Sequence, residues 1–175
     1  MYKKLVTGAV SLAFVVGLFP VTPAFASPHE DKHVKVLSVL SGDWLQVSIN
    51  GDSKFVKIIG IDAPDRLTAT TKAQCYNRES WQRAKKIAEN AFVNLIEDET
   101  QGNEDKNGNL LRNVVMEDGR VLGTMMVRDG YAKAVNAKKP SFYQKTFMKY
   151  EKEAKAAKRG FWAANKCDGF YTKVR

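Results

Sequence analysis

Short runs of apolar residues, separated by turn residues, dominate the chain after residue 33. Three of these runs cover residues 34–40, 44–49 and 54–61. Ser41-Gly42-Asp43 lies between the first two, and Asn50-Gly51 lies between the second and the third. Asn-Gly between apolar runs is a strong signal for a tight hairpin. The pattern predicts an antiparallel meander of three strands.

The spacing of apolar residues becomes helical in the middle of the chain. They recur three and four positions apart, at Trp81, Ala84, Ala88, Ala91, Phe92 and Leu95. This spacing places them on one face of a helix. The acidic segment 97–109, rich in Gly and Asn, is predicted to be a loop.

The second half of the chain is predicted to contain two further strands and two helices. The strands are residues 110–116 and 131–135, a short helix covers 121–129, and Pro140 opens the last helix. Such an order fits one α+β domain with a mainly β core. We expect a five-stranded OB-like barrel with about three helices packed on it.

The first 26 residues have the pattern of a secretory signal peptide. Lys3 and Lys4 are basic, residues 9–19 are apolar, and Ala24-Phe25-Ala26 is a small-x-small cleavage signal. A membrane anchor is the alternative, but the apolar run is shorter than the roughly 20 residues that span a bilayer. We expect cleavage after Ala26, export to the periplasm or out of the cell, and no stable membrane insertion afterwards.

The mature chain is long enough for one domain with its own core. We place a leader at 27–33, the domain at 34–165, and a tail that carries Cys167 at 166–175. The formal net charge is +9 for the whole chain, and removal of the signal peptide lowers it by two. A basic exported domain suits nucleic acid or another polyanion, although lysines that only maintain solubility give the same charge.

The chain has two cysteines, Cys75 and Cys167. An even number of cysteines in a chain that enters an oxidising compartment predicts a disulfide. There is no Cys-x-x-Cys and no Cys/His metal spacing, which argues against zinc.

Two carboxylates are predicted to meet at one end of the meander. Asp43 lies in the first turn and Asp62 at the end of the third strand, and Asp65 follows three residues later. Paired carboxylates suit a hard cation such as calcium. On spacing alone, ordinary turn chemistry is the simpler interpretation of these residues.

Six segments, in order, resemble the staphylococcal nuclease (thermonuclease) family from about Val34 to Trp162. They are Ser41-Gly42-Asp43 and residues 55–65, 75–80, 105–109, 118–133 and 159–162. The resemblance implies an OB-fold barrel of the staphylococcal nuclease type that hydrolyses phosphodiester bonds of DNA and RNA. It also implies a calcium ion, held by the carboxylates of Asp43 and Asp62 and by the carbonyl of Ala63.

The resemblance places the catalytic residues of the family on positions where this chain differs. The glutamate that handles the water is Asp65, and the two phosphate-binding arginines are Lys57 and Asn109. Aspartate is one methylene shorter than glutamate, lysine lacks the two-pronged grip of a guanidinium, and asparagine carries no charge. We therefore expect a weakened site.

Other basic residues are candidates for holding phosphate. Arg66 lies next to Asp65, whereas Arg112, three positions after Asn109, is expected on the opposite face of its strand. The segment 133–140 lacks the base-stacking tyrosines that well-known family members carry. Electrostatic contacts can replace stacking, and the candidates here are Lys133, Lys138 and Lys139.

Three hypotheses follow. The favoured one is a thermonuclease-like domain with weak or absent phosphodiesterase activity that binds nucleic acid or another polyanion. The alternative is an active calcium-dependent nuclease. The third, a structural domain without a nucleic-acid role, conflicts with the retention of both Asp43 and Asp62.

Overall fold

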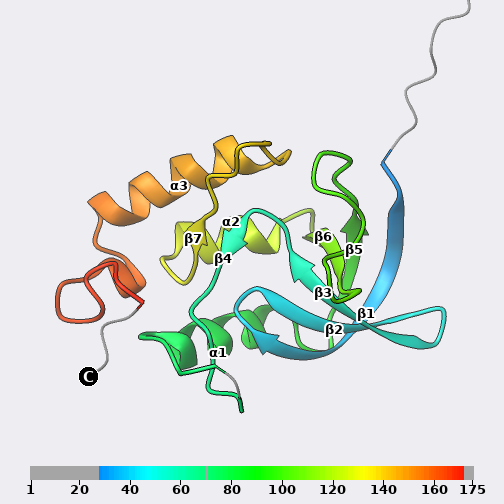
Figure 1. The fold of residues 1–175 in the computed structure, drawn as a ribbon, viewed down its shortest axis with the longest axis horizontal. Helices are drawn as coiled ribbons and strands as arrows, with labels where there is room; N and C mark the ends of the chain where they lie inside the picture. Colours follow the sequence, from blue (N-terminus) through cyan, green and yellow to red (C-terminus); the bar gives the residue numbers. More distant parts are fainter. Residues whose placement is uncertain (1–27, 70, 172–175) are drawn as a thin grey trace, which may run out of the picture.

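A closed five-stranded β-barrel forms the centre of the molecule (Figure 1). The computed structural model describes residues 28–69 and 71–171. The barrel strands are β1 (Glu30–Ser41), β2 (Trp44–Ile49), β3 (Asp52–Ile58), β5 (Phe92–Ile96) and β6 (Leu110–Met116). They follow the order β1-β2-β3-β6-β5. All neighbours are antiparallel except β3 and β6, which are parallel.

Three helices and a small second sheet surround the barrel (Figure 1). The helices are α1 (Asn77–Ala88), α2 (Leu122–Arg128) and α3 (Gln144–Ala156), and a 3₁₀ turn, η1, covers Gly160–Trp162. The second sheet pairs β4 (Ile61–Asp62) with β7 (Lys133–Ala134). Helix α1 packs on β1, and α2 lies between the barrel and α3. The predicted α+β fold with a five-stranded barrel is confirmed.

Apolar side chains at alternate positions of the strands fill the barrel. Leu45 and Val47 of β2 point inward, and Gln46 between them faces outward. Phe147 of α3 and Met126 of α2 are fully buried and extend the same core beyond the barrel. Each side chain of this size contributes about 1.5–3 kcal/mol when fully buried.

The predicted helix over residues 81–95 is wrong in its second half. Helix α1 ends at Ala88, and Asn90 adopts a φ of 63° that breaks the helical conformation. Residues 92–96 then form β5, in which Val93 and Leu95 point into the barrel. A short apolar run fits either a helix or a strand, so periodicity alone could not separate the two.

The predicted strand over 131–135 is also wrong as a barrel strand. Only Lys133 and Ala134 pair, and they pair with β4 outside the barrel. The predicted third strand, 54–61, is divided because Gly60 bends the chain with a φ of 77°. This bend separates Asp62 from the barrel strand that precedes it.

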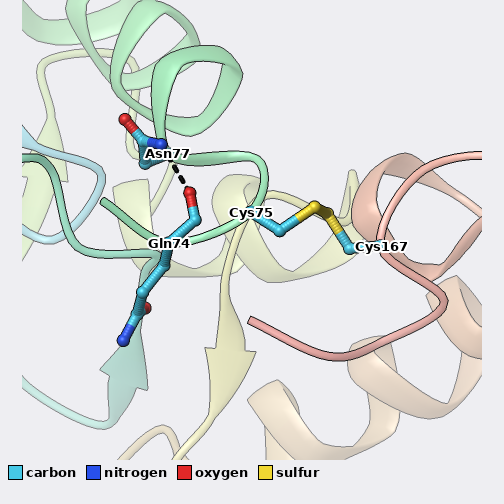
Figure 2. The surroundings of a disulfide bond; sticks show 4 residues. All are labelled: Gln74, Cys75, Asn77 and Cys167. Atoms are coloured by element: carbon cyan, nitrogen blue, oxygen red, sulfur yellow. Dashed lines mark hydrogen bonds between the residues drawn. A yellow bond between two sulfur atoms is a disulfide. The ribbon is translucent and has the colours of Figure 1, made fainter. Parts of the chain in front are cut away.

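The two ends of the described chain are part of the fold. Strand β1 begins at Glu30, so it includes four residues of the predicted leader. Near the other end, Cys167 is fully buried and forms the predicted disulfide with Cys75 (Figure 2). The predicted signal peptide lies outside the described residues. No helix in the described part of the chain is long and apolar enough to cross a membrane.

Candidate functional site

Asp43 occupies the turn between β1 and β2, and its carboxylate is held from two sides. The Ser41 hydroxyl donates a hydrogen bond to Oδ1 at 2.7 Å, and Nζ of Lys57 lies 3.4 Å from Oδ2. The strand register produces this pair, because Trp44 lies opposite Lys57. Asp43 is only 3% exposed, so Lys57 is the neighbouring positive charge for a largely buried carboxylate.

Asp62 reaches the same end of the barrel through the bend at Gly60 and the short strand β4. The turn before Asp43 packs directly on the residue after Asp62, because a Cβ at Gly42 would lie 2.7 Å from Cβ of Ala63. The pKa of Asp62 is raised above its ordinary value by partial burial and by the nearby charge of Asp43. Lys57 and Lys133 lower this pKa but do not compensate fully.

Asp43, Asp62 and Ala63 carry the candidate oxygen ligands for a hard cation. Two carboxylates and the carbonyl of Ala63 are the ligand types that calcium accepts, and water can complete the shell. Burial is the main cause of the raised pKa of Asp62, and the charge of Asp43, which a bound cation would offset, is the second. In residues 28–69 and 71–171, no group of three or more His, Cys, Asp or Glu side chains is arranged to hold a metal. Calcium binding therefore stays a prediction.

Asp65 lies in the loop after β4, where Gln74 holds it. The Gln74 amide donates to Oδ2 of Asp65 at 3.0 Å, and the backbone N–H of Asp65 donates to Oε1 of Gln74 at 2.9 Å. The backbone N–H of Gln74 also donates to the Asp65 carbonyl at 2.9 Å. These three hydrogen bonds position the carboxylate of Asp65. Sequence analysis did not identify Gln74, because no local pattern links it to a residue nine positions away.

Asn109 closes a loop beside Lys57. Its side-chain amide donates to Oδ2 of Asp105 at 2.8 Å, and its backbone N–H donates to Oδ1 at 3.0 Å. The pKa of Asp105 is lowered, first by the hydrogen bonds from Asn109 and further by the charge of Lys57. The loop thus lies near the acidic site, but Asn109 brings no charge to it.

The other predicted phosphate ligands have different surroundings. The Arg66 guanidinium lies 4.1 Å from the centre of the Trp81 ring and donates to the Leu40 carbonyl at 3.1 Å. These contacts hold it against α1. As expected from its strand position, Arg112 lies elsewhere: it is buried and pairs with Glu97 at 3.3 Å.

The lysines that follow α2 form two groups. Lys133 is close enough to Asp62 to affect its pKa, and its ammonium lies 4.1 Å from the centre of the Tyr171 ring. Lys138 and Lys139 are exposed in the segment after β7. Lys133 therefore lies near Asp62, whereas the structure places Lys138 and Lys139 only on the exposed surface, and a role of the three lysines in holding phosphate stays a prediction.

Trp44 and Phe55 form an outward-facing aromatic pair next to Lys57, and the sequence analysis did not identify it. The rings of Trp44 and Phe55 lie 6.0 Å apart on β2 and β3, and Phe55 is 44% exposed. In the strand register, Trp44 lies opposite Lys57 and Phe55 lies opposite Gln46. The alternating pattern was the available signal, because it places all four residues on the outer face.

Comparisons with known proteins agree with the family resemblance. A family model described as "Staphylococcal nuclease homologue" matches residues 55–164. A thermonuclease from Staphylococcus hyicus is 25% identical over 170 residues, which are 92% of this chain and 99% of the relative. The SPbeta prophage-derived endonuclease YokF of Bacillus subtilis is 28% identical over 127 residues, 72% of this chain but 42% of that protein. An uncharacterized endonuclease of Escherichia coli O157:H7 is 28% identical over 133 residues, covering 76% and 78% of the two chains.

Proposed function

The chain belongs to the family of staphylococcal nuclease homologues, whose model matches residues 55–164, and we propose that it is an exported calcium-dependent nuclease of low activity. The ion pair between Lys57 and the buried Asp43, both close enough to Asp62 to affect its pKa, carries this proposal. A disulfide is typical of proteins in oxidising compartments, which supports export.

Each residue has a distinct part in phosphodiester hydrolysis. Asp43, Asp62 and the carbonyl of Ala63 would hold calcium, which when bound stabilises negative charge on a phosphate oxygen. Asp65, held by Gln74, orients a water molecule and accepts its proton as the water oxygen bonds to phosphorus. The bond to the leaving sugar oxygen breaks, and that oxygen takes a proton from solvent.

The weakness of the site has a physical cause at two positions. The ammonium of Lys57 provides charge but lacks the two parallel N–H donors with which a guanidinium holds a phosphate. Asn109 provides no charge, and its amide is already bonded to Asp105. An arginine that stabilises a phosphoryl transition state is worth about 10³–10⁵ in rate. The hydrogen bond between Asn109 and Asp105 also favours the second candidate function, nucleic-acid binding without cleavage.

Replacement of Asp43 by alanine tests the proposed function. We expect slow cleavage of denatured DNA by the chain from Ser27 onward, abolished by a chelator. Asp43→Ala should reduce this rate by about a hundredfold or more, because a catalytic metal is worth several kcal/mol. The measurement is release of acid-soluble nucleotides with and without calcium.

Asp118→Ala is the matched control, because Asp118 is an exposed turn aspartate that pairs with Arg120. Cleavage that resists chelator would contradict the proposal. Salt-dependent binding without cleavage would leave a nucleic-acid-binding module, and neither binding nor cleavage would leave a structural domain. A rate that matches efficient family members would establish the fully active nuclease.

The substrate strand is proposed to stack on the Trp44–Phe55 pair. Bases that stack on aromatic side chains gain about 1–3 kcal/mol each, whatever their sequence. Phe55→Ser should therefore weaken the binding of a single-stranded oligonucleotide by about 5- to 100-fold. Fluorescence anisotropy measures this affinity. The control is Phe142→Ser, a change at another exposed phenylalanine, and equal effects of the two changes would rule out a specific stacking surface.

A further inference from the structure

The C-terminal segment of the described chain, residues 160–171, contacts strands β4 and β7 next to the acidic site. The hydroxyl of Tyr171 donates to the carbonyl of Asp62 at 2.6 Å and accepts a hydrogen bond from the backbone N–H of Lys133 at 3.1 Å. Asp62 and Lys133 are partners in the pairing of β4 with β7. The phenol thus joins both strands at the residue that carries the candidate calcium ligand. Tyr171 is 8% exposed, so water competes little for these bonds.

The same segment also supports the loop that holds Asp65. The backbone N–H of Cys75 donates to the carbonyl of Tyr171 at 2.8 Å. The preceding residue is Gln74, which makes three hydrogen bonds to Asp65. Two acidic residues with different proposed roles, Asp62 and Asp65, are therefore tied to one short segment.

A disulfide bond cross-links this segment to the residue that follows Gln74. Figure 2 shows the disulfide between Cys75 and Cys167, with Gln74 beside Cys75 and bonded to Asn77 through its backbone carbonyl. The segment otherwise packs in a small cluster, separate from the main core. Its buried members are Phe161, Cys167 and Tyr171, with Cys75, Tyr76 and Trp162 around them.

Such a small cluster gives the segment limited independent stability. The ends of domains are poorly ordered unless something ties them down. The disulfide joins residues 92 positions apart and so removes much of the freedom that the segment would otherwise have. Without it, the contacts of Tyr171 with Asp62 and Cys75 depend on this small cluster and on a few further contacts, such as the hydrogen bond from the backbone N–H of Phe161 to the carbonyl of Gly130.

We propose that the disulfide-linked segment is a positioning element, through which Tyr171 orients Asp62 and Gln74 orients Asp65, so that the site is fully formed only when Cys75 and Cys167 are oxidised. This inference rests on the proposed function, because it assumes that these carboxylates hold a cation and a water. Thermodynamic linkage makes the effect reciprocal: calcium binding should also favour the oxidised chain.

The first test removes only the hydroxyl of Tyr171. In the oxidised protein, Tyr171→Phe should weaken calcium binding by about threefold or more, because the change removes both hydrogen bonds of the hydroxyl. Titration calorimetry measures the affinity. Amide hydrogen exchange of a peptide that spans Ile61 to Asp65 should become faster, and this second readout needs no metal. Tyr143→Phe is the control, a half-buried tyrosine whose ring packs on Phe147.

The second test compares the oxidised and reduced forms of the unmodified protein. Reduction should weaken calcium binding at least as much as Tyr171→Phe and should accelerate exchange over residues 61–65, while β2 and β3 stay protected. If reduction unfolds the barrel, the test of the inference rests on hydrogen exchange and calcium affinity of the oxidised Tyr171→Phe variant. Unchanged exchange over residues 61–65 in that variant would overturn the inference.

Failure of the proposed function gives a different result. An oxidised protein that binds no calcium would contradict the calcium site, whatever the effect of Tyr171→Phe on exchange. A protein that binds calcium equally well with and without the hydroxyl would retain the proposed function and refute the positioning role of Tyr171.

Discussion

Replacing Lys57 and Asn109 together by arginine should raise the rate of calcium-dependent cleavage by about 10³-fold or more. Lys57 already lies 3.4 Å from Asp43, so a guanidinium placed there would face the same carboxylate and the same phosphate. Leu111 lies opposite Lys57 in the pairing of β3 with β6, so the loop that ends at Asn109 lies close to Lys57. Two guanidinium groups could then hold one phosphate between them.

The loop between Asp105 and Asn109 has to stay folded when Asn109 is replaced by arginine. Asn109→Arg removes the amide that bonds Asp105, but a guanidinium can pair with the same carboxylate. Thermal unfolding, followed by circular dichroism, establishes that the variant is folded. Asp65→Glu is then added in a separate step, because a longer carboxylate also has to fit its hydrogen bonds with Gln74.

A control for charge is available in the same strand and the same loop. Lys54→Arg with Asn107→Arg makes the same chemical changes at exposed positions that match no catalytic residue of the family. A similar rate increase in this control would indicate a general electrostatic effect on substrate binding. A folded Lys57→Arg, Asn109→Arg variant without any gain would show that the missing guanidinium groups do not explain the weak site.

Removal of the disulfide should lower the free energy of unfolding by about 4 kcal/mol in the chain-entropy model. Its cysteines are 92 residues apart, so the bond restricts a long stretch of the unfolded chain. The variant is Cys75→Ala with Cys167→Ala, and the measurement is urea unfolding followed by circular dichroism. Cys167 is fully buried, which adds the loss of its packing to the effect of the lost cross-link.

Phe170→Ala provides the comparison within the same segment. Phe170 is largely exposed, so its truncation should change the free energy of unfolding by less than about 0.5 kcal/mol. A loss of under about 1 kcal/mol in the double cysteine variant would contradict the importance of the cross-link.

Much of the barrel could be predicted because its signals are local. The turns at Gly42 and Asn50-Gly51 fix the hairpins, and alternation assigns the inward face of β2. Strand β5 could not be distinguished in this way, because the residues from Ala91 to Leu95 also continue the apolar spacing of α1. The strand exists because Val93 and Leu95 fill the barrel, which is a tertiary effect.

In the candidate site too, contacts that follow from local signals could be predicted, and contacts between distant segments could not. Asp43 and Lys57 meet through a hairpin register that the turn residues specify, and the family resemblance pointed to both. The hydrogen bonds of Tyr171 with Asp62 and of Gln74 with Asp65 join segments that no periodicity connects. Contacts of this kind emerge only when the complete chain is packed.

The parallel pairing of β3 with β6 has a consequence for folding kinetics. Ile58 lies opposite Arg112, so this seam of the barrel closes only after a long intervening stretch has been brought across. Pairing between residues so distant in the chain slows folding, because loop closure costs entropy before any contact is gained. Lys57 lies in this seam and Asn109 directly precedes it, so the two positions that we propose to face the phosphate come together only when the seam closes. Closure of the seam would therefore be the folding step that assembles the proposed phosphate-binding surface.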